Sequence, residues 1–551
     1  MFKSARGWKV AGMGQGAESG GAAAATPRSM PLAEALALAE QHRAAGRLVE
    51  ARTLCNKILA AQPDEANAVH LLGLLAHQSG QLGEAIEQLR RAAKLAPAVP
   101  HFHANLGEMY RLAGRIDDAV RKGRRAVELR PAYPEALSNL GVALYERADY
   151  EEAARCHRRA IDCNPQFAVA HSNLGNALQA LRRFDEAIAS YRAALALDRG
   201  FADCWSNLGL SLAQLGRHDE ALDAYRAAVA ADPLHADGHV GVALQTLLRG
   251  NFADGWFEYL WRWRLRQLSP PRIAAPAWQG DAPAGRHILL VAEQGLGDTL
   301  QFCRYAGVLH DAGAKISLMV QRPLARLLSA SLPWAAVVEE HPQHPPCDIY
   351  CPLLSVPLLL GTTPETIPAP IPYLQPPAEL AAAWRDELGE RMRLRVGIAW
   401  GGSPKHVNEH NRSLPLATLT PLFAIEGIDW VSLQVGPRAA EAAGAPARLL
   451  DPSARLGDFL DTAALVSALD LVISVDTAVA HLAGAMGVPV WLLLPVGNDW
   501  RWQLNADDTR WYPTMRLFRQ QAYGAWQPVV AGVGAALSRL AAAGRNERRE
   551  R

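Results

Sequence analysis

The tripeptide Asn-Leu-Gly occurs four times at one fixed interval along the chain. Each copy begins 34 residues after the previous one, at residues 105–107, 139–141, 173–175 and 207–209. Alanine and proline recur in the same phase, at Ala85, Ala119, Ala153, Ala187 and Ala221 and at Pro63, Pro97, Pro131, Pro165 and Pro233. A period of this length indicates stacked units, each too small to bury its own apolar face, rather than one compact core.

The period and its small residues resemble tetratricopeptide repeats, which are helix-turn-helix units. Counted from the prolines, six units run from about residue 32 to residue 235, and a degenerate seventh begins at Ala236. We therefore predict an α-solenoid, a tetratricopeptide superhelix, over residues 31–265. Aromatic residues crowd the seventh unit and are expected to cap the stack or join it to the next domain; the alternative is a stacking platform for a sugar or a base. These residues are Trp256, Phe257, Tyr259, Trp261 and Trp263.

One asparagine occupies the same position in four successive units and predicts a ladder of amides along the superhelix. An amide donates and accepts hydrogen bonds together, so such a ladder could hold the backbone of an extended polypeptide without reading its sequence. The alternative is that Asn-Leu-Gly belongs to the repeat itself, whatever the repeat binds. The ladder residues are Asn105, Asn139, Asn173 and Asn207.

Composition excludes several classes of function. In 551 residues, 56 Lys and Arg balance 55 Asp and Glu, a net charge of +1 that argues against a nucleic-acid binder or an electrostatic membrane anchor. Seven scattered cysteines show no zinc spacing and fit a reducing cytoplasm, where we expect the protein to lie. No apolar run reaches the roughly 18 residues of a membrane-spanning helix. Residues 1–30 are expected to form a disordered tail, and residues 542–551 a charged tail.

The texture of the sequence changes after Pro270 and Pro271. A linker over residues 266–285 leads into apolar strand-like runs that alternate with helical stretches, as parallel α/β sheets require. We predict two doubly wound α/β domains, over residues 286–392 and 393–541. Ligands in such sheets bind at the carboxyl ends of the strands.

The first polar loop at a predicted strand end contains Gly295, Gly297 and Asp298. Its glycines permit a close backbone approach, and Asp298 stands at a helix start, where a carboxylate is favoured. Asp298 as a plain helix cap is the alternative.

Two further loops complete the predicted site. Residues 401–413 gather Lys405, Arg412 and Ser413 beside two glycines, which suits an anionic ligand such as a diphosphate; a solvated basic loop is the alternative. Residues 474–481 place Asp476 and Thr477 before an Ala- and Gly-rich helix, whose free backbone N–H groups suit phosphate. His481, about one turn further, either faces the ligand or is a buried helix residue.

Together the three loops resemble the heptosyltransferase family of glycosyltransferases, family nine, over residues 286–541. The resemblance rests on the Gly-Leu-Gly-Asp-Thr turn and on Asp-Thr-Ala-Val-Ala-His at 476–481, where Ala478 replaces the glycine usual in the family. It implies a GT-B fold of two Rossmann-like domains, an acceptor-side one followed by one for the donor. It also implies inverting, metal-independent transfer from a nucleotide-diphosphate sugar, with Asp298 as the general base and Arg412 or Lys405 as the cation for phosphate.

Repeats followed by such a transferase are similar in architecture to O-GlcNAc transferases and to bacterial flagellin-modifying glycosyltransferases. The similarity implies a glycosyltransferase that modifies a protein hydroxyl presented by the repeats. Two alternatives remain: the same chemistry on a lipopolysaccharide or glycolipid acceptor, and a non-catalytic repeat scaffold with a degenerate transferase-like domain. We expect a nucleotide sugar as co-substrate, no metal and no other cofactor. A polypeptide is the expected partner, with no nucleic acid and no integral membrane segment.

Overall fold

A computed structural model describes residues 30–341, 343–404, 406, 408–445 and 449–549. It divides the chain into two compact units. The first contains the described residues up to Ser211 with Ala230–Asp232, and the second contains Leu212–Val229 and the residues from Pro233 onward. The predicted tail 1–30 and Lys405 fall outside the described residues, except for Met30.

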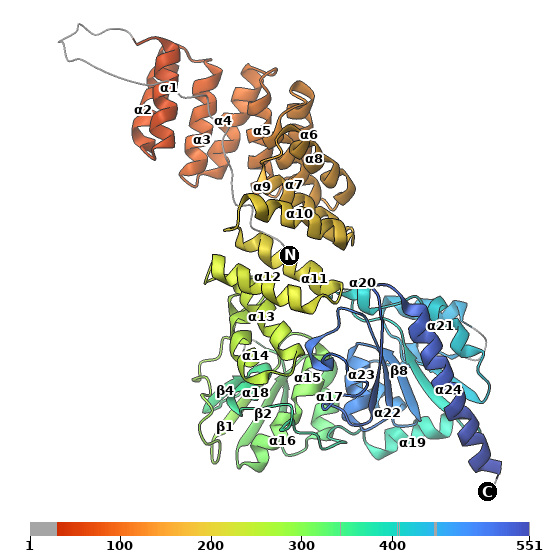
Figure 1. Ribbon diagram of the computed structural model, residues 1–551. Helices are drawn as coiled ribbons and strands as arrows, with labels where there is room; N and C mark the ends of the chain where they lie inside the picture. Colours follow the sequence, from red (N-terminus) through yellow and green to blue (C-terminus); the bar gives the residue numbers. More distant parts are fainter. Residues whose placement is uncertain (1–29, 342, 405, 407, 446–448, 550–551) are drawn as a thin grey trace. The chain divides into compact units, whose positions relative to one another are not determined.

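The first unit is a stack of antiparallel helix pairs (Figure 1). The helices alternate between 13 and 14 residues, separated by short turns: α1 Leu32–Ala44, α2 Leu48–Ala61, α3 Ala66–Gln78, α4 Leu82–Leu95, α5 Pro100–Leu112, α6 Ile116–Leu129, α7 Pro134–Glu146, α8 Tyr150–Cys163, α9 Ala168–Ala180, α10 Phe184–Leu197 and α11 Ala202–Gln214. The predicted helical solenoid is confirmed.

Glycine lets the two helices of a repeat approach closely. A Cβ atom on Gly141 of α7 would lie 2.6 Å from the ring of His157 in α8, and one on Gly175 of α9 would lie 2.5 Å from the ring of Tyr191 in α10. Both distances are too short for a real Cβ atom. The third residue of Asn-Leu-Gly is therefore fixed by packing in these repeats.

The second unit begins with helices of the same kind: α12 (His218–Ala231), α13 (Ala236–Leu248), α14 (Phe252–Tyr259) and the 3₁₀-helix η1 (Leu260–Arg264). Three aromatic side chains of α14, those of Phe252, Trp256 and Tyr259, pack into the core of the domains that follow, whereas Phe257 is exposed. The ring of Trp256 lies 5.0 Å from that of Trp500 and 6.1 Å from that of Phe302. The seventh repeat thus joins the repeat helices to the α/β part, which is one of its two expected roles. Trp256 is buried and therefore offers no platform for a ligand.

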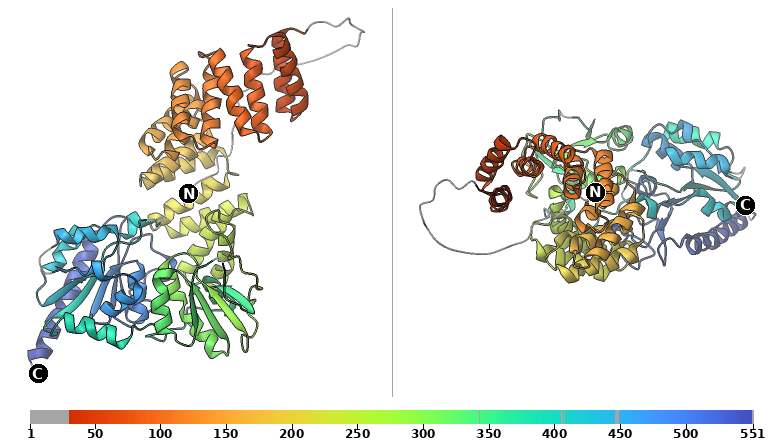
Figure 2. Two further views of the ribbon diagram at one scale, coloured as in Figure 1. Left: turned by 180° about the vertical axis from the view of Figure 1, so that it is seen from behind. Right: turned by 90° about the horizontal axis from the view of Figure 1, so that it is seen from above.

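Two separate parallel sheets follow, with helices covering their faces (Figure 2). The four-stranded sheet has the order β3-β2-β1-β4, and the six-stranded sheet has the order β10-β9-β8-β5-β6-β7. The strands are β1 His287–Val291, β2 Lys315–Val320, β3 Ala336–Glu339, β4 Ile349–Pro352, β5 Leu394–Ala399, β6 Ile428–Ser432, β7 Leu449–Leu450, β8 Leu471–Val475, β9 Val490–Leu494 and β10 Met515–Arg519. This is an α/β architecture.

Helices and short 3₁₀ turns connect the strands. They are α15 Leu296–Phe302, α16 Arg304–Asp311, α17 Arg322–Ser331, η2 Leu353–Ser355, α18 Val356–Leu359, α19 Ala378–Glu387, α20 Glu409–Arg412, α21 Leu416–Phe423, η3 Pro437–Gly444, η4 Ser453–Arg455, α22 Phe459–Val466, α23 Ala478–Ala485, η5 Trp500–Trp502 and α24 Trp526–Arg549. No helix in the described part of the chain is both long and apolar enough to cross a bilayer.

Two segments differ from the sequence-based expectation. Helix α24 runs on to Arg549, through most of the segment expected to be a charged tail. The predicted linker is attached to the four-stranded sheet, because Trp278 is buried and its backbone N–H donates to the carbonyl of Tyr350 at 2.8 Å.

Candidate functional site

The order of the strands changes direction beside β1 and between β5 and β8. In open parallel sheets, such switch points leave a crevice at the carboxyl ends of the strands, where ligands bind. The three predicted loops follow β1, β5 and β8 at these positions, and a fourth loop, which contains Asp499 and Arg501, follows β9. Side chains from these loops meet between the two sheets.

Asp298 is held from two sides. One carboxylate oxygen, Oδ2, accepts a hydrogen bond of 2.8 Å from the backbone N–H of Gly295, the N-cap residue of α15. Asp298 therefore caps the helix from within its first turn, not from the N-cap position that the alternative interpretation expects. The other oxygen, Oδ1, pairs with Nη2 of Arg501. Burial raises the pKa of Asp298, and the charge of Arg501 acts against this increase. The group is therefore both a cap and one member of an ion pair within the second unit.

Arg501 is the residue that sequence reasoning missed. Its side chain is 8% exposed, and its guanidinium reaches three acceptors: Asp298, Asp499 at 2.9 Å and Oε1 of Gln301 at 2.5 Å. Its ring neighbours are Trp500 and Phe302, at 4.6 and 5.5 Å from the guanidinium carbon. The only signal in the sequence was its place shortly after the predicted strand 488–494, because the neighbouring residues form no known motif.

Asp476 and His481 lie at the start of α23, beside α15. Nε2 of His481 is 3.9 Å from Oδ1 of Asp476, and Nδ1 of His481 hydrogen-bonds to the hydroxyl of Tyr512 at 2.9 Å. Burial, and next the charge of Asp499, raises the pKa of Asp476 to about 6. Burial lowers the pKa of His481 well below its ordinary value, so its imidazole is neutral at pH 7. The two helices meet because Gly297 has no side chain: a Cβ there would lie 2.8 Å from Cδ2 of His481.

Thr477 is the N-cap residue of α23 but makes no capping hydrogen bond with its side chain. Its hydroxyl lies 3.1 Å from that of Ser474 instead. Thr477 is 8% exposed and is the second residue after β8, at the switch point.

The basic loop after β5 is more nearly neutral than its sequence indicates. Nε of Arg412 lies 3.2 Å from Oε2 of Glu409, and the hydroxyl of Ser413 donates to Oε1 of the same carboxylate at 2.6 Å. Ser413 also accepts from the backbone N–H of Gly402 at 3.0 Å. The charge of Arg412 nevertheless lowers the pKa of Asp476, which opposes the effect of burial. Arg412 and Asp476 therefore lie close enough for their charges to interact.

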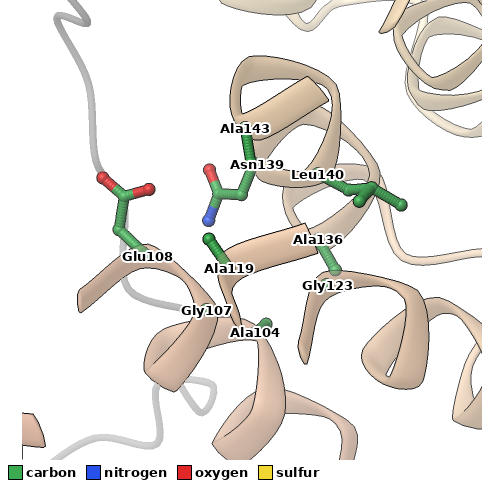
Figure 3. A pocket seen from close by; sticks show the side chains of 9 residues that line it. All are labelled: Ala104, Gly107, Glu108, Ala119, Gly123, Ala136, Asn139, Leu140 and Ala143. Carbon is green, nitrogen blue, oxygen red and sulfur yellow. The ribbon is translucent and has the colours of Figure 1, made fainter. Parts of the chain in front are cut away.

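The four ladder asparagines differ in their surroundings. Nδ2 of Asn105 lies 2.9 Å from Nε2 of His70, and Nδ2 of Asn207 donates to Oδ1 of Asn176 at 3.0 Å, so each is tied to the preceding repeat. Asn139 and Asn173 are half-buried. Figure 3 shows the amide of Asn139 at a small pocket that Ala104, Gly107 and Glu108 of α5 also line. The ladder is therefore a set of two bonded and two more accessible amides.

Within the described residues, no three His, Cys, Asp or Glu side chains are arranged to hold a metal ion. The roles predicted for the individual site residues stay predictions.

Comparison with known proteins identifies the repeats. Models of the tetratricopeptide repeat match residues 70–134 and 172–236, and a TPR repeat model matches residues 143–181. Protein FlbA of Caulobacter vibrioides is 28% identical over 327 residues, which is 54% of this chain and 54% of that protein. The chain thus spans about half the length of this curated relative.

Solved structures that are similar to about a third of this chain include the following two. PilF of Pseudomonas aeruginosa is 21% identical, with 37% of this chain and 93% of that chain covered and a TM-score of 0.34. YrrB, a TPR protein with an unusual peptide-binding site, is 20% identical, with 33% and 95% covered and a TM-score of 0.30. The matches to the family models show tetratricopeptide repeats in the N-terminal region of this protein.

Proposed function

We propose that the protein is an inverting, metal-independent glycosyltransferase of GT-B type that modifies a hydroxyl group of a polypeptide bound by its repeats. The observation that carries the proposal is that α15, which contains Asp298, meets the start of α23 between two parallel sheets, with Gly297 next to His481 and His481 near Asp476. These residues carry the resemblance to the heptosyltransferase family. Their convergence from distant parts of the chain is what a shared site requires.

Asp298 is the general base in this proposal. It takes the proton of the acceptor hydroxyl as the oxygen attacks the anomeric carbon, and the bond from that carbon to the diphosphate oxygen breaks on the opposite face. Burial raises the pKa of this carboxyl, which makes it a stronger base than an exposed aspartate. The ordered hydrogen bond from Gly295 holds one oxygen in place.

The leaving diphosphate gains negative charge, which the site must compensate. The N-terminus of α23 after Thr477 offers backbone N–H groups and the positive end of a helix dipole. Arg412 supplies a cation that Glu409 partly neutralises. Lys405 remains the second candidate cation. This arrangement needs no metal ion for the departure of the leaving group.

The repeats supply the acceptor in this proposal. Asn139 and Asn173 are the accessible amides of the ladder, and each can bond to both a C=O and an N–H group of an extended chain.

The decisive test is transfer from a panel of UDP, GDP, ADP, CDP and dTDP sugars, with protein from the source cell as acceptor and mass spectrometry as the readout. Asp298→Asn is expected to lower transfer by about 10²- to 10⁴-fold while nucleoside-diphosphate binding, measured by calorimetry, is retained. Exposed Asp508→Asn is the matched control. Unchanged transfer in Asp298→Asn would remove this residue from the mechanism.

The nature of the acceptor is tested separately. The double variant Asn139→Ala with Asn173→Ala is expected to lose transfer to polypeptide and to keep its affinity for nucleoside diphosphate. If transfer goes to a glycolipid and is insensitive to this variant, the second enzymatic alternative holds. If no nucleotide of the panel binds, the chain is a repeat scaffold.

A further inference from the structure

We propose that Arg501 is a positioning residue. It fixes the carboxylate of Asp298 and keeps it ionised between the two sheets. The inference rests on the proposed role of Asp298 as the base. It concerns a residue that no resemblance to a known family brings forward.

The contacts of Arg501 join two parts of the fold. Asp298 and Gln301 belong to α15, which follows β1 of the four-stranded sheet, whereas Asp499 and Arg501 follow β9 of the six-stranded sheet. Gln301 is fully buried and Arg501 nearly so. A guanidinium is planar with donors in a fixed fork, so three simultaneous acceptors set both its position and its orientation. Asp298 is therefore oriented from a neighbouring domain as well as from its own helix.

Several other charged or titratable groups face this pair. Tyr259 of α14 and Glu293 of the loop after β1 interact electrostatically with Asp298. Glu293 is itself paired with buried Arg262 at 2.9 Å. From the six-stranded sheet, the charge of Asp499 raises the pKa of Asp298, whereas Arg501 lowers it.

Asp476, just before α23, and His481 of α23 also interact electrostatically with Arg501. The imidazole of His481 is neutral at pH 7, because burial lowers its pKa. Arg501 is thus the cation in direct contact with Asp298, and Asp499 is the anion held by the same guanidinium. The two residues act on Asp298 with opposite sign.

The opposite effects of Arg501 and Asp499 on the pKa of Asp298 provide a test, because a residue with a purely structural role would not shift this pKa in the predicted direction. Removal of the cation in Arg501→Gln is expected to move the acidic limb of the pH–rate profile upward by about one unit or more, because a carboxylate is protonated more easily without a neighbouring positive charge. Asp499→Asn has nearly the same shape and removes an anion, so it is expected to move the same limb downward. Arg501→Lys keeps the charge and loses the fork, so it is expected to lower the plateau with a smaller shift.

The profile is measured with the nucleotide sugar that gives turnover in the panel described above. Arg510→Gln, which changes an exposed arginine paired with Glu365, is the control and is expected to change neither limb nor plateau. Shifts in the same direction for Arg501→Gln and Asp499→Asn would overturn the proposal, as would a limb and plateau unchanged in Arg501→Gln. If Arg501→Gln does not fold, the downward shift in Asp499→Asn and the lowered plateau in Arg501→Lys decide the matter.

A second readout separates this proposal from the proposed function. Protein labelled with ¹³C at the aspartate carboxyl groups is titrated by NMR, and the signal missing in Asp298→Asn identifies Asp298. The titration midpoint is expected to rise in Arg501→Gln and fall in Asp499→Asn, whether or not any sugar is transferred. Opposite midpoint shifts without turnover would leave the positioning intact and reject the glycosyltransferase. Sugar transfer with unchanged titration midpoints would support the glycosyltransferase and reject the positioning role of Arg501.

Discussion

Two histidines inside the repeats are buried in the neutral form. Burial lowers the pKa of His70 and of His157 to about 3. His70 lies beside the amide of Asn105, whereas His157 packs against Gly141, and its Nδ1 has no hydrogen-bond partner among the described residues. An imidazole that stays neutral in the folded state and becomes charged in the unfolded state makes stability depend on pH.

The sign of this dependence follows from the two pKa values. Below about pH 6.5 the unfolded chain binds protons that the folded chain does not, so stability falls as the pH falls towards 3. Each histidine is expected to contribute a loss of about 1.4 kcal/mol per pH unit in this window. Urea unfolding of the full chain between pH 7 and 4.5 measures the slope. His157→Leu is expected to flatten it, while His171→Leu, at the surface, serves as control. An equal slope in both variants contradicts the assignment.

The candidate site divides residues that local sequence can reveal from those it cannot. Asp298, Asp476 and His481 stand in short patterns of glycine, threonine and alanine, so spacing along the chain located them. Arg501 acquires its role only where the loop after β9 folds against α15, 203 residues away. The ion pair between Arg412 and Glu409 likewise depends on the local turn that brings the two side chains together. The sequence of this loop indicates only an excess of basic residues.

At the scale of elements, the turn between α11 and α12 lies directly against the loop after β9. A Cβ on Gly497 would lie 3.0 Å from the carbonyl oxygen of Ala213 and 3.1 Å from Cα of Gln214. The side chain of Gln214 accepts a hydrogen bond from Nδ2 of Asn411 at 3.4 Å, next to Arg412. A helical repeat therefore supports two of the loops that form the candidate site.

Gly497→Val is expected to push the loop after β9 away from this turn and to displace Arg501 and Asp499, which follow it. A displacement of about 1 Å at a reacting group can lower a rate by about 100-fold, so transfer is expected to fall by about 10- to 100-fold. Transfer kinetics and calorimetry with nucleoside diphosphates measure the effect. The control is Gly532→Ala in α24, where an added Cβ meets open space. Wild-type transfer in Gly497→Val would show that the turn does not position the loop.

The elements themselves were predictable where periodicity is strong. A constant interval of 34 residues fixes the helix pairs, and alternating apolar runs indicate the parallel strands. The attachment of the linker through Trp278 and Tyr350 was not predictable, because it depends on a backbone hydrogen bond to the edge strand β4. The proline-rich composition indicated a linker but not what it contacts. The extension of α24 to Arg549 was missed because consecutive charges are as compatible with a helix as with a tail.

At the scale of the whole chain, the boundary between compact units lies inside the repeats rather than at their end. The second unit contains α13 and α14, whose side chains share a core with both sheets, including Phe252, Trp256 and Trp511. Buried Arg262 of η1 pairs with Glu293 in the loop after β1. The periodicity shows where repeats occur but not which of them need the α/β domains in order to bury their apolar faces.

Two truncations test this division. A chain that begins at Ala202 keeps α11 and all of the second unit, and it is expected to unfold in one cooperative transition and to bind nucleoside diphosphate.

A chain that begins at Arg286, at the domain boundary predicted from the sequence, exposes Trp500, Trp511 and Phe302 and leaves Glu293 buried without its arginine. Loss of one large aromatic contact costs about 3–5 kcal/mol, and loss of one partner of a buried ion pair costs about as much. Together these losses come to about 6–10 kcal/mol, within the 5–15 kcal/mol that typically stabilises a domain, so the shorter chain is expected to melt at a much lower temperature or to aggregate. Circular dichroism melting and calorimetry compare the two fragments, and equal melting temperatures would mean that the last repeats are dispensable for the fold that carries the site.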